Sequence, residues 1–187
     1  YPNIFTLVAV EANKKEAWVF EISDRKDQRV GLVKFLRSLH ANKDRMIGFN
    51  NIGFDYPVIH YILKNQNCTV KQIYDKAMEI IHSMREDKFG NTIRDKDVML
   101  TQIDLFKIHH FDNIARATSL KVIEFNMRSD NIEDLPFDVG KNLDNDQKDV
   151  LIKYNKHDVM MTLDFYKHSI KMVKFREELS RKYGKNF

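Results

Sequence analysis

Short apolar runs separated by polar stretches dominate the first half of the chain and predict strands followed by helices. Segments 4–10 and 17–22 are two such runs, and the polar residues between them are typical of an antiparallel hairpin. Apolar residues recur at helical spacing in segment 27–40, whereas segment 46–49 is an apolar run that predicts a buried strand. Segment 56–64 follows as a predicted helix.

The second half of the chain continues this alternation. Helical spacing predicts a helix over 70–84, and the apolar residues of 98–107 predict a return to the sheet. A short helix is expected at 119–127, followed by a long connection over 128–143 whose acids and proline argue against regular structure. The final helices are predicted from 146 to about 183. Strands followed by a strand–helix alternation predict an α/β fold with a mixed central sheet flanked by helices.

Composition places the chain among ordinary globular domains. A length of 187 residues fits a single domain over 1–187 with an ample core. The net charge of +4 is mild, but basic residues concentrate in the C-terminal segment, as expected either for a phosphate-binding helix or for a solvated face. Cys68 is the only cysteine, which excludes an intrachain disulfide and favours a reducing, cytoplasmic location. The sequence has no signal peptide and no apolar run of membrane length, so no membrane partner is expected.

Asp55 lies where a predicted strand hands over to a predicted helix. The run at 46–49 breaks into turn residues that include Gly53, and the helix at 56–64 begins directly after Asp55. Ligands of open α/β sheets collect beyond the carboxyl ends of strands, which makes Asp55 a candidate site residue. The structural alternative is that Asp55 caps the helix, with Pro57 in the first turn.

A second carboxylate, Asp158, falls on the apolar stripe of the C-terminal helix. It lies four residues after Tyr154 and three before Met161, both of which belong to that stripe. An acid on the inward face is costly to desolvate unless a cation or hydrogen-bond donors meet it. Asp158 is therefore either a buried acid paired within the fold or part of a site shared with Asp55.

Both acids stand in motifs that resemble those of a nuclease family. The pattern Asn50-x-x-x-Phe54-Asp55 resembles the second motif of RNase H-like 3′–5′ exonucleases, most closely the proofreading domains of DNA polymerases. The pattern Tyr154-x-x-x-Asp158 resembles their third motif, in the variety that uses tyrosine. The histidine variety would have histidine at position 153, where this chain has lysine. The order of the two motifs and their strand and helix settings fit the family together.

The resemblance covers most of the chain but lacks one motif. Segments 20–25, 119–121 and 131–136 resemble exonuclease regions of bacteriophage DNA polymerases. The family carries a first motif, Asp-x-Glu, on the opening strand of its sheet, and this sequence has no such triplet. In the phage-type sequences the triplet stands just before a Tyr-Pro-Asn like that at 1–3, so the first strand is expected to be missing from this chain. A rival alignment places Ala9 and Glu11 at the two acidic positions, and this alignment also leaves the site incomplete.

The resemblance implies a role for each motif residue. It implies that Asp55 and Asp158 are catalytic metal ligands for two divalent ions, Mg²⁺ or Mn²⁺, joined in an intact relative by the missing Asp and Glu. Tyr154 would orient the attacking water, because a phenol with a pKa near 10 is a poor general base at neutral pH. Substrate binding is expected from Asn50 and Phe54, and a supporting role from Asp104.

Three functions follow from these expectations. The first is a metal-dependent 3′–5′ exonuclease domain that edits single-stranded DNA 3′ ends for a polymerase domain beyond residue 187. The second is a catalytically incomplete domain that keeps the fold and binds DNA or serves a structural role; an RNase of the same superfamily is a third. The histidines are not expected to form a metal site. His109 and His110 would point to opposite faces of a strand, and His157 is expected to be exposed.

Overall fold

An antiparallel hairpin opens the fold. The computed structural model describes residues 1–187 except 15, 87–90, 92, 111–117, 128–133 and 185–187. Strand β1 (Ile4–Val10) pairs antiparallel with β2 (Ala17–Ser23), and Thr6 lies opposite Glu21. The hairpin predicted at 4–10 and 17–22 is therefore confirmed.

A second pair of strands is parallel, and the candidate site residues Asp104 and Asp55 lie at or just beyond its carboxyl end. Strand β3 (Arg45–Gly48) pairs with β4 (Thr101–Asp104), and Gly48 lies opposite Asp104 at the carboxyl end of both strands. The strand predicted over 98–107 is confirmed only for 101–104; it begins three residues later than predicted, and after 104 the chain turns into helix α4 (Leu105–His110). The cause is local: the Asp104 carboxylate accepts a hydrogen bond from the Phe106 amide at 3.0 Å, as a helix-capping side chain does.

The longer helices begin and end close to the predicted positions. The first helix starts two residues later than predicted, and the C-terminal segment forms one continuous helix of 39 residues rather than several. That helix begins with a capping box, in which Asp144 and Gln147 bond each other's backbone amides. The helices are α1 (Arg29–Asn42), α2 (Asp55–Lys64), α3 (Val70–Glu86), α5 (Leu120–Asn126) and α6 (Asn145–Tyr183), with a short 3₁₀ turn at Asp95–Asp97.

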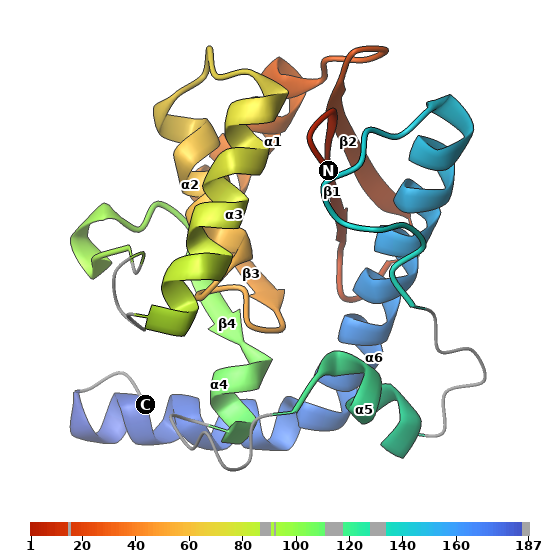
Figure 1. Cartoon of the computed structure of the whole chain (residues 1–187). Helices are drawn as coiled ribbons and strands as arrows, with labels where there is room; N and C mark the ends of the chain where they lie inside the picture. Colours follow the sequence, from red (N-terminus) through yellow and green to blue (C-terminus); the bar gives the residue numbers. More distant parts are fainter. Residues whose placement is uncertain (15, 87–90, 92, 111–117, 128–133, 185–187) are drawn as a thin grey trace.

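The class is mixed α/β, with two small sheets. Within the described residues β1–β2 and β3–β4 form separate two-stranded sheets, so the single mixed sheet that the sequence predicts is not seen there. Figure 1 shows the two pairs apart, with α2 and α3 beside the parallel pair. The largest core cluster packs the hairpin against α1, α2 and α3, with Ile22, Leu36 and Ile62 almost fully buried.

Helix α6 connects the two sheets. Figure 1 shows it running along the hairpin and then changing direction to pass beneath β4 and α4. In its first half, Asn155 Nδ2 donates to the Thr6 carbonyl of β1 at 3.4 Å. Further along, Phe165 packs against Phe49, which directly follows β3, with ring centroids 6.2 Å apart. One helix thus contacts both strand pairs.

Candidate functional site

The loop between β3 and α2 is held by a buried carboxylate at the end of β4. Asp104 is 3% exposed, and its two oxygens accept hydrogen bonds from the amides of Asn50 at 2.8 Å and Ile52 at 3.1 Å. The amides of Phe106 and Lys107 bond the same side chain. Burial raises the pKa of Asp104, while these backbone donors oppose the rise. Asp104 thus fixes the loop that leads to Asp55, and its supporting role in a catalytic site stays a prediction.

The backbone of this loop is tightly constrained. Asn50 adopts a left-handed conformation with φ of 57°, which asparagine tolerates better than most residues. Its carbonyl accepts from the Phe54 amide at 3.0 Å, closing a turn that brings the two predicted substrate-binding residues together. Asn51 is buried, and its Nδ2 donates to Gln102 Oε1 at 2.7 Å, which ties the loop to β4 a second time.

Asp55 is the first residue of α2 rather than its cap. Phe54 occupies the capping position and no side chain caps this end, so the simple capping interpretation of Asp55 does not hold. A carboxylate in the first turn still interacts favourably with the helix dipole. Asp55 therefore projects from the start of a helix, beyond the carboxyl end of β3, as the sequence predicts for a site residue.

The surroundings of Asp55 make its carboxyl group a weaker acid. Desolvation by the surrounding protein raises its pKa to about 7, its own amide opposes the rise, and the negative charge of Asp104 adds to it. Asp55 nevertheless keeps an exposed surface, and the solvent there screens its charge and opposes part of this rise in pKa. A nearby cation would stabilise the ionised form of such a carboxyl group and lower its pKa.

Tyr154 and Asp158 form a second polar group on α6. The Tyr154 hydroxyl donates to the Asp158 carboxylate one helical turn further on. Burial and the negative charges of Asp158, Glu124 and Asp134 raise the pKa of Tyr154, so the phenol stays protonated at neutral pH. Tyr154 also packs at the edge of a small core cluster that includes Leu151. This geometry agrees with a hydrogen-bonding role for Tyr154 and not with a role as a base.

Glu124 is a residue that the motif comparison did not single out. It lies on α5, is 1% exposed, and its charge acts on Tyr154. The sequence did carry a signal, because Glu124 interrupts the apolar run Val122-Ile123-Glu124-Phe125. A buried acid next to Tyr154 increases the negative charge around the Tyr154–Asp158 pair.

The described residues therefore contain two groups of predicted site residues. Asn50, Phe54, Asp55 and Asp104 gather at the end of the parallel strands, and Tyr154 and Asp158 lie on α6. The packing of Phe49 on Phe165 links the strand that leads into the first group with the helix that carries the second. Within the described part of the chain, no set of three or more His, Cys, Asp or Glu side chains is arranged to hold a metal ion.

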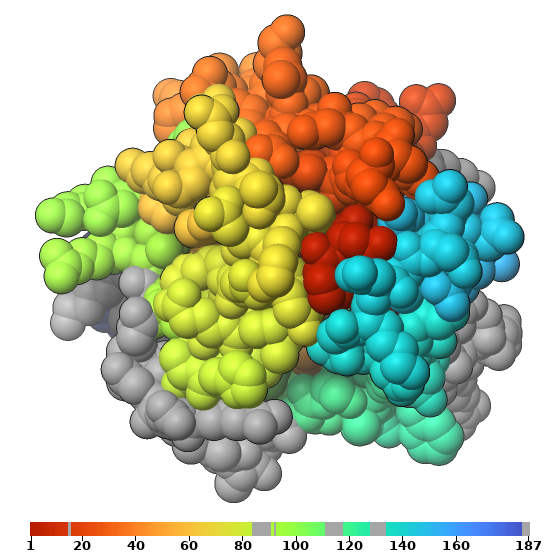
Figure 2. Space-filling model, turned by 45° about the horizontal axis from the view of Figure 1, so that its top comes forward, coloured from red at the N-terminus to blue at the C-terminus, as the bar shows by residue number. Residues whose placement is uncertain are grey.

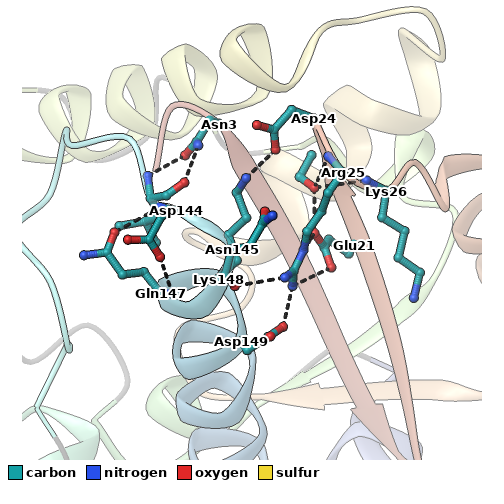
Figure 3. A network of polar contacts seen from close by, with 12 residues as sticks. Asn3, Glu21, Asp24, Arg25, Lys26, Asp144, Asn145, Gln147, Lys148 and Asp149 are labelled. Carbon is teal, nitrogen blue, oxygen red and sulfur yellow. Dashed lines mark hydrogen bonds and ion pairs between the residues drawn. The ribbon is translucent and has the colours of Figure 1, made fainter.

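A polar network fixes the first turn of α6 to the end of β2. Arg25 bonds the buried Glu21 through Nε at 2.8 Å, and its other nitrogens reach Asp149 and the Asn145 carbonyl (Figure 3). Burial disfavours the charged form of Glu21, but hydrogen bonds from Arg25 and Ser23 outweigh it and lower the pKa of Glu21. Lys148, 1% exposed, pairs with Asp24 beside this cluster. The network positions the helix that carries Tyr154 and Asp158.

The N-terminal residues bond to the segment that leads into α6. Asn3 exchanges two hydrogen bonds with the backbone of Leu143, and the Tyr1 hydroxyl donates to the Phe137 carbonyl at 2.6 Å. Figure 2 shows these first residues enclosed between α3 and the segment that leads into α6. A surface hollow of about 550 Å³ lies along that segment, between Leu135 and Gln147, and contains none of the predicted site residues.

Three histidines differ from their predicted settings. His109 and His110 lie on α4 and not on a strand; His109 Nε2 is 2.8 Å from Ser169 Oγ, and His110 Nδ1 is 3.2 Å from the Phe106 carbonyl. His157, expected to be exposed, is half-buried, and its Nε2 is buried without a hydrogen-bond partner. The reason is that α6 is covered on more than one side in its first half, by β1 and by α5.

Comparisons with protein-family models, with curated proteins and with solved structures find no match for this chain. Among the described residues, no helix has both the length and the apolar character needed to cross a bilayer. The functional assignment therefore depends on the residues and their geometry.

Proposed function

We propose that this chain is a 3′–5′ exonuclease-like domain of RNase H-like fold, of the kind that proofreads for bacteriophage-type DNA polymerases. Its substrate is the single-stranded 3′ end of DNA. The observation that carries the proposal is the position of Asp55 at the carboxyl end of the parallel strand pair, with Asp104 holding the preceding loop. Tyr154 and Asp158 lie on α6, whose later turns pack against the region of this strand pair through Phe165 and Phe49.

The proposal assigns chemistry to the residues of this chain. Asp55 and Asp158 are hard oxygen donors, the ligand type that Mg²⁺ and Mn²⁺ prefer. Two such ions, when bound, supply an activated water and neutralise charge at the leaving 3′ oxygen. Tyr154, kept protonated by its surroundings, donates its one hydroxyl proton to Asp158, so its oxygen accepts a hydrogen bond from the attacking water and orients it. Asn50 and Phe54 shape the groove for the terminal nucleotides, the amide by hydrogen bonding and the ring by stacking.

A complete site needs further acids, and the edge of β1 that faces away from β2 suggests where they belong. Glu21 directs its backbone amide and carbonyl away from β1, toward Gln28, at 3.0 and 2.8 Å. Its cross-strand partner Thr6 therefore directs its own backbone groups away from β2, toward the opposite edge of β1. No described strand pairs with that edge. We infer that a strand bearing Asp-x-Glu, supplied from outside residues 1–187, pairs there in place of the 3.4 Å contact between Asn155 Nδ2 and the Thr6 carbonyl, and joins the two sheets into one.

The test is digestion of a labelled single strand in Mg²⁺ or Mn²⁺ by a longer protein that contains residues 1–187 together with the strand that pairs along this edge of β1. Shortening from the 3′ end is expected, and Asp55→Ala abolishes it. Asp44→Ala, an exposed acid just before β3, is the matched control and keeps the parent rate. If Asp55→Ala digests as fast as the parent protein, the assignment of the site is wrong.

The second candidate is a catalytically incomplete module that binds DNA. It is favoured by the sequence itself, which contains no Asp-x-Glu triplet. In this case the longer protein binds the single strand but leaves it intact, and Asp55→Ala has no further effect. The same assay therefore separates the two candidates.

A further inference from the structure

The second half of α6 packs through one face only. Phe165, Ser169 and Val173 recur every four residues, are each at most 8% exposed, and lie against the β3–β4 region and α4. Ser169 Oγ is 2.8 Å from His109 Nε2, and Arg176 donates to the Ile108 carbonyl at 2.9 Å. These contacts fix which side of the helix faces outward.

The outward face combines cations with an exposed aromatic ring. Lys171, Phe175 and Lys182 follow one another at intervals of four and seven residues, so they share one side of the helix, opposite Val173 and Ser169. Phe175 is 59% exposed. Lys174 and Arg181 border this side, and Glu178 is the acid on it. We call Lys171, Lys174, Phe175, Arg181 and Lys182 the outer face of α6.

The cations of the outer face are available to a partner. Nearby charges are already paired, since Lys167 bonds Asp164 and Glu177 bonds Arg45. By contrast, no ion pair within the described residues involves Lys171, Lys174, Arg181 or Lys182, although the Lys182 ammonium lies over the exposed Tyr183 ring, 5.4 Å from its centroid. Between 164 and 184 the helix has six basic residues and three acidic ones, so its surplus is positive. A partner with regularly spaced negative charges complements it.

The exposed ring of Phe175 favours a single-stranded nucleic acid as the partner. One exposed apolar residue is ordinary on a protein surface, so Phe175 alone carries no argument. Sequence-tolerant binders of single strands place basic side chains along the phosphates and aromatic rings against the bases. A duplex offers the same phosphates but keeps its bases stacked inside, where Phe175 cannot reach them.

We propose that the outer face of α6 binds single-stranded nucleic acid, with phosphates along the lysines and arginine and one base stacked on Phe175. This binding requires no cleavage and no metal ion. It therefore stands or falls separately from the exonuclease proposal.

The test uses residues 1–187 and a fluorescent twelve-nucleotide oligothymidylate in EDTA, with the dissociation constant measured by anisotropy at several salt concentrations. The double variant Lys171→Gln/Lys174→Gln is expected to weaken binding and to reduce the slope of log Kd against log salt by about 1.4, roughly 0.7 for each phosphate that the variant no longer neutralises. Phe175→Leu is expected to weaken binding roughly 5- to 150-fold at unchanged slope, because the base no longer stacks on an aromatic ring. Phe175→Trp keeps an aromatic face and the parent affinity.

The matched control neutralises two exposed lysines elsewhere, Lys34→Gln/Lys64→Gln on α1 and α2, and leaves Kd within about twofold. The proposal is overturned if the parent chain binds no oligonucleotide, if the control pair weakens binding as much as the α6 pair, or if Phe175→Leu binds like the parent. Should a variant fail to fold, cross-linking of the parent chain to a bromodeoxyuridine oligonucleotide decides the matter. Cross-links within 171–183 support the outer face, and cross-links confined to other segments rule it out.

Discussion

The Asp104 carboxylate accepts a hydrogen bond from the Asn50 amide at 2.8 Å, so the end of β4 determines the shape of the loop after β3. The two residues are 54 positions apart in sequence, and the parallel pairing of Gly48 with Asp104 brings them together. Asp55 begins α2 directly after this loop. Its position therefore depends on the Asp104 side chain, which accepts hydrogen bonds from backbone amides of the loop.

Replacing Asp104 should destabilise the fold. Asp104→Asn keeps the size of the side chain but turns one acceptor oxygen into a donor that faces backbone amides. We expect the free energy of unfolding to fall by about 2–3 kcal/mol, since hydrogen bonds to a charged buried acceptor are removed. Urea denaturation at pH 7 measures the change. Asp44→Asn, at an exposed position before β3, should stay within about 0.5 kcal/mol of the parent. Equal stability of the two variants would contradict the role given to Asp104.

The pKa of Asp55 should be elevated and should respond to Asp104. Carboxyl ¹³C titration by NMR is expected to place it above the ordinary 3.8, in the direction of 7. Asp104→Asn should lower it, because a repelling negative charge is removed. A titration at the ordinary value in the parent chain would show that the surroundings of Asp55 are not as the structure describes.

The same shift predicts how stability varies with pH. The folded chain holds a proton on Asp55 at pH values where the unfolded chain has released it. This group therefore makes folding less favourable as the pH rises between 3.8 and about 7. In Asp55→Asn that contribution is absent, so unfolding midpoints measured over this range should fall less steeply with pH than those of the parent. A steeper fall in the variant would contradict the sign of the shift.

Local patterns predicted the elements of this fold better than their arrangement. The hairpin strands and α2 could be located because alternation and helical spacing are properties of neighbouring residues. The end of β4 could not, because the strand stops where the Asp104 side chain caps the next helix and not where the apolar run ends. The separation of the two strand pairs was also beyond the pattern, because pairing joins residues far apart in sequence.

The candidate site was predictable to a similar extent. Asp55 and Asp158 were found from their motifs, and the structure gives them the expected settings at a strand–helix junction and on a helix. The donors that surround Asp104 come from backbone amides, which carry no sequence signal. Whether Asp55 and Asp158 share metal ions stays a prediction.

A pair of glycines should respond oppositely to the same substitution. A Cβ on Gly48 would lie 2.7 Å from Asn51 Cβ and 2.8 Å from its Cγ, so Gly48→Ala must displace Asn51 and weaken its bond to Gln102. We expect a decrease of about 1–3 kcal/mol in the free energy of unfolding. At Gly31 on α1 the nearest atom would be a Phe20 ring carbon at 3.6 Å, an ordinary contact. Gly31→Ala should stabilise the chain by about 0.5–1 kcal/mol. Two changes of the same sign in thermal or urea unfolding would contradict this account.

Replacing Lys148 and replacing Asp24 should change the free energy of unfolding by different amounts. The reason is that the lysine side chain of this ion pair is 1% exposed and the aspartate side chain 69%. Lys148→Met fills the same space with an apolar chain and leaves Asp24 in water, so the free energy of unfolding should change by no more than about 1 kcal/mol. Asp24→Ala leaves the buried ammonium without its carboxylate and should lower the unfolding midpoint clearly more. Adding Lys148→Met to Asp24→Ala should restore much of that stability. The exposed pair of Lys141 and Asp138 is the control, and removal of either partner there should leave the midpoint nearly unchanged. If Lys148→Met proves the more damaging substitution, the ammonium contributes attraction that exceeds its desolvation cost, and the first turn of α6 depends on that charge.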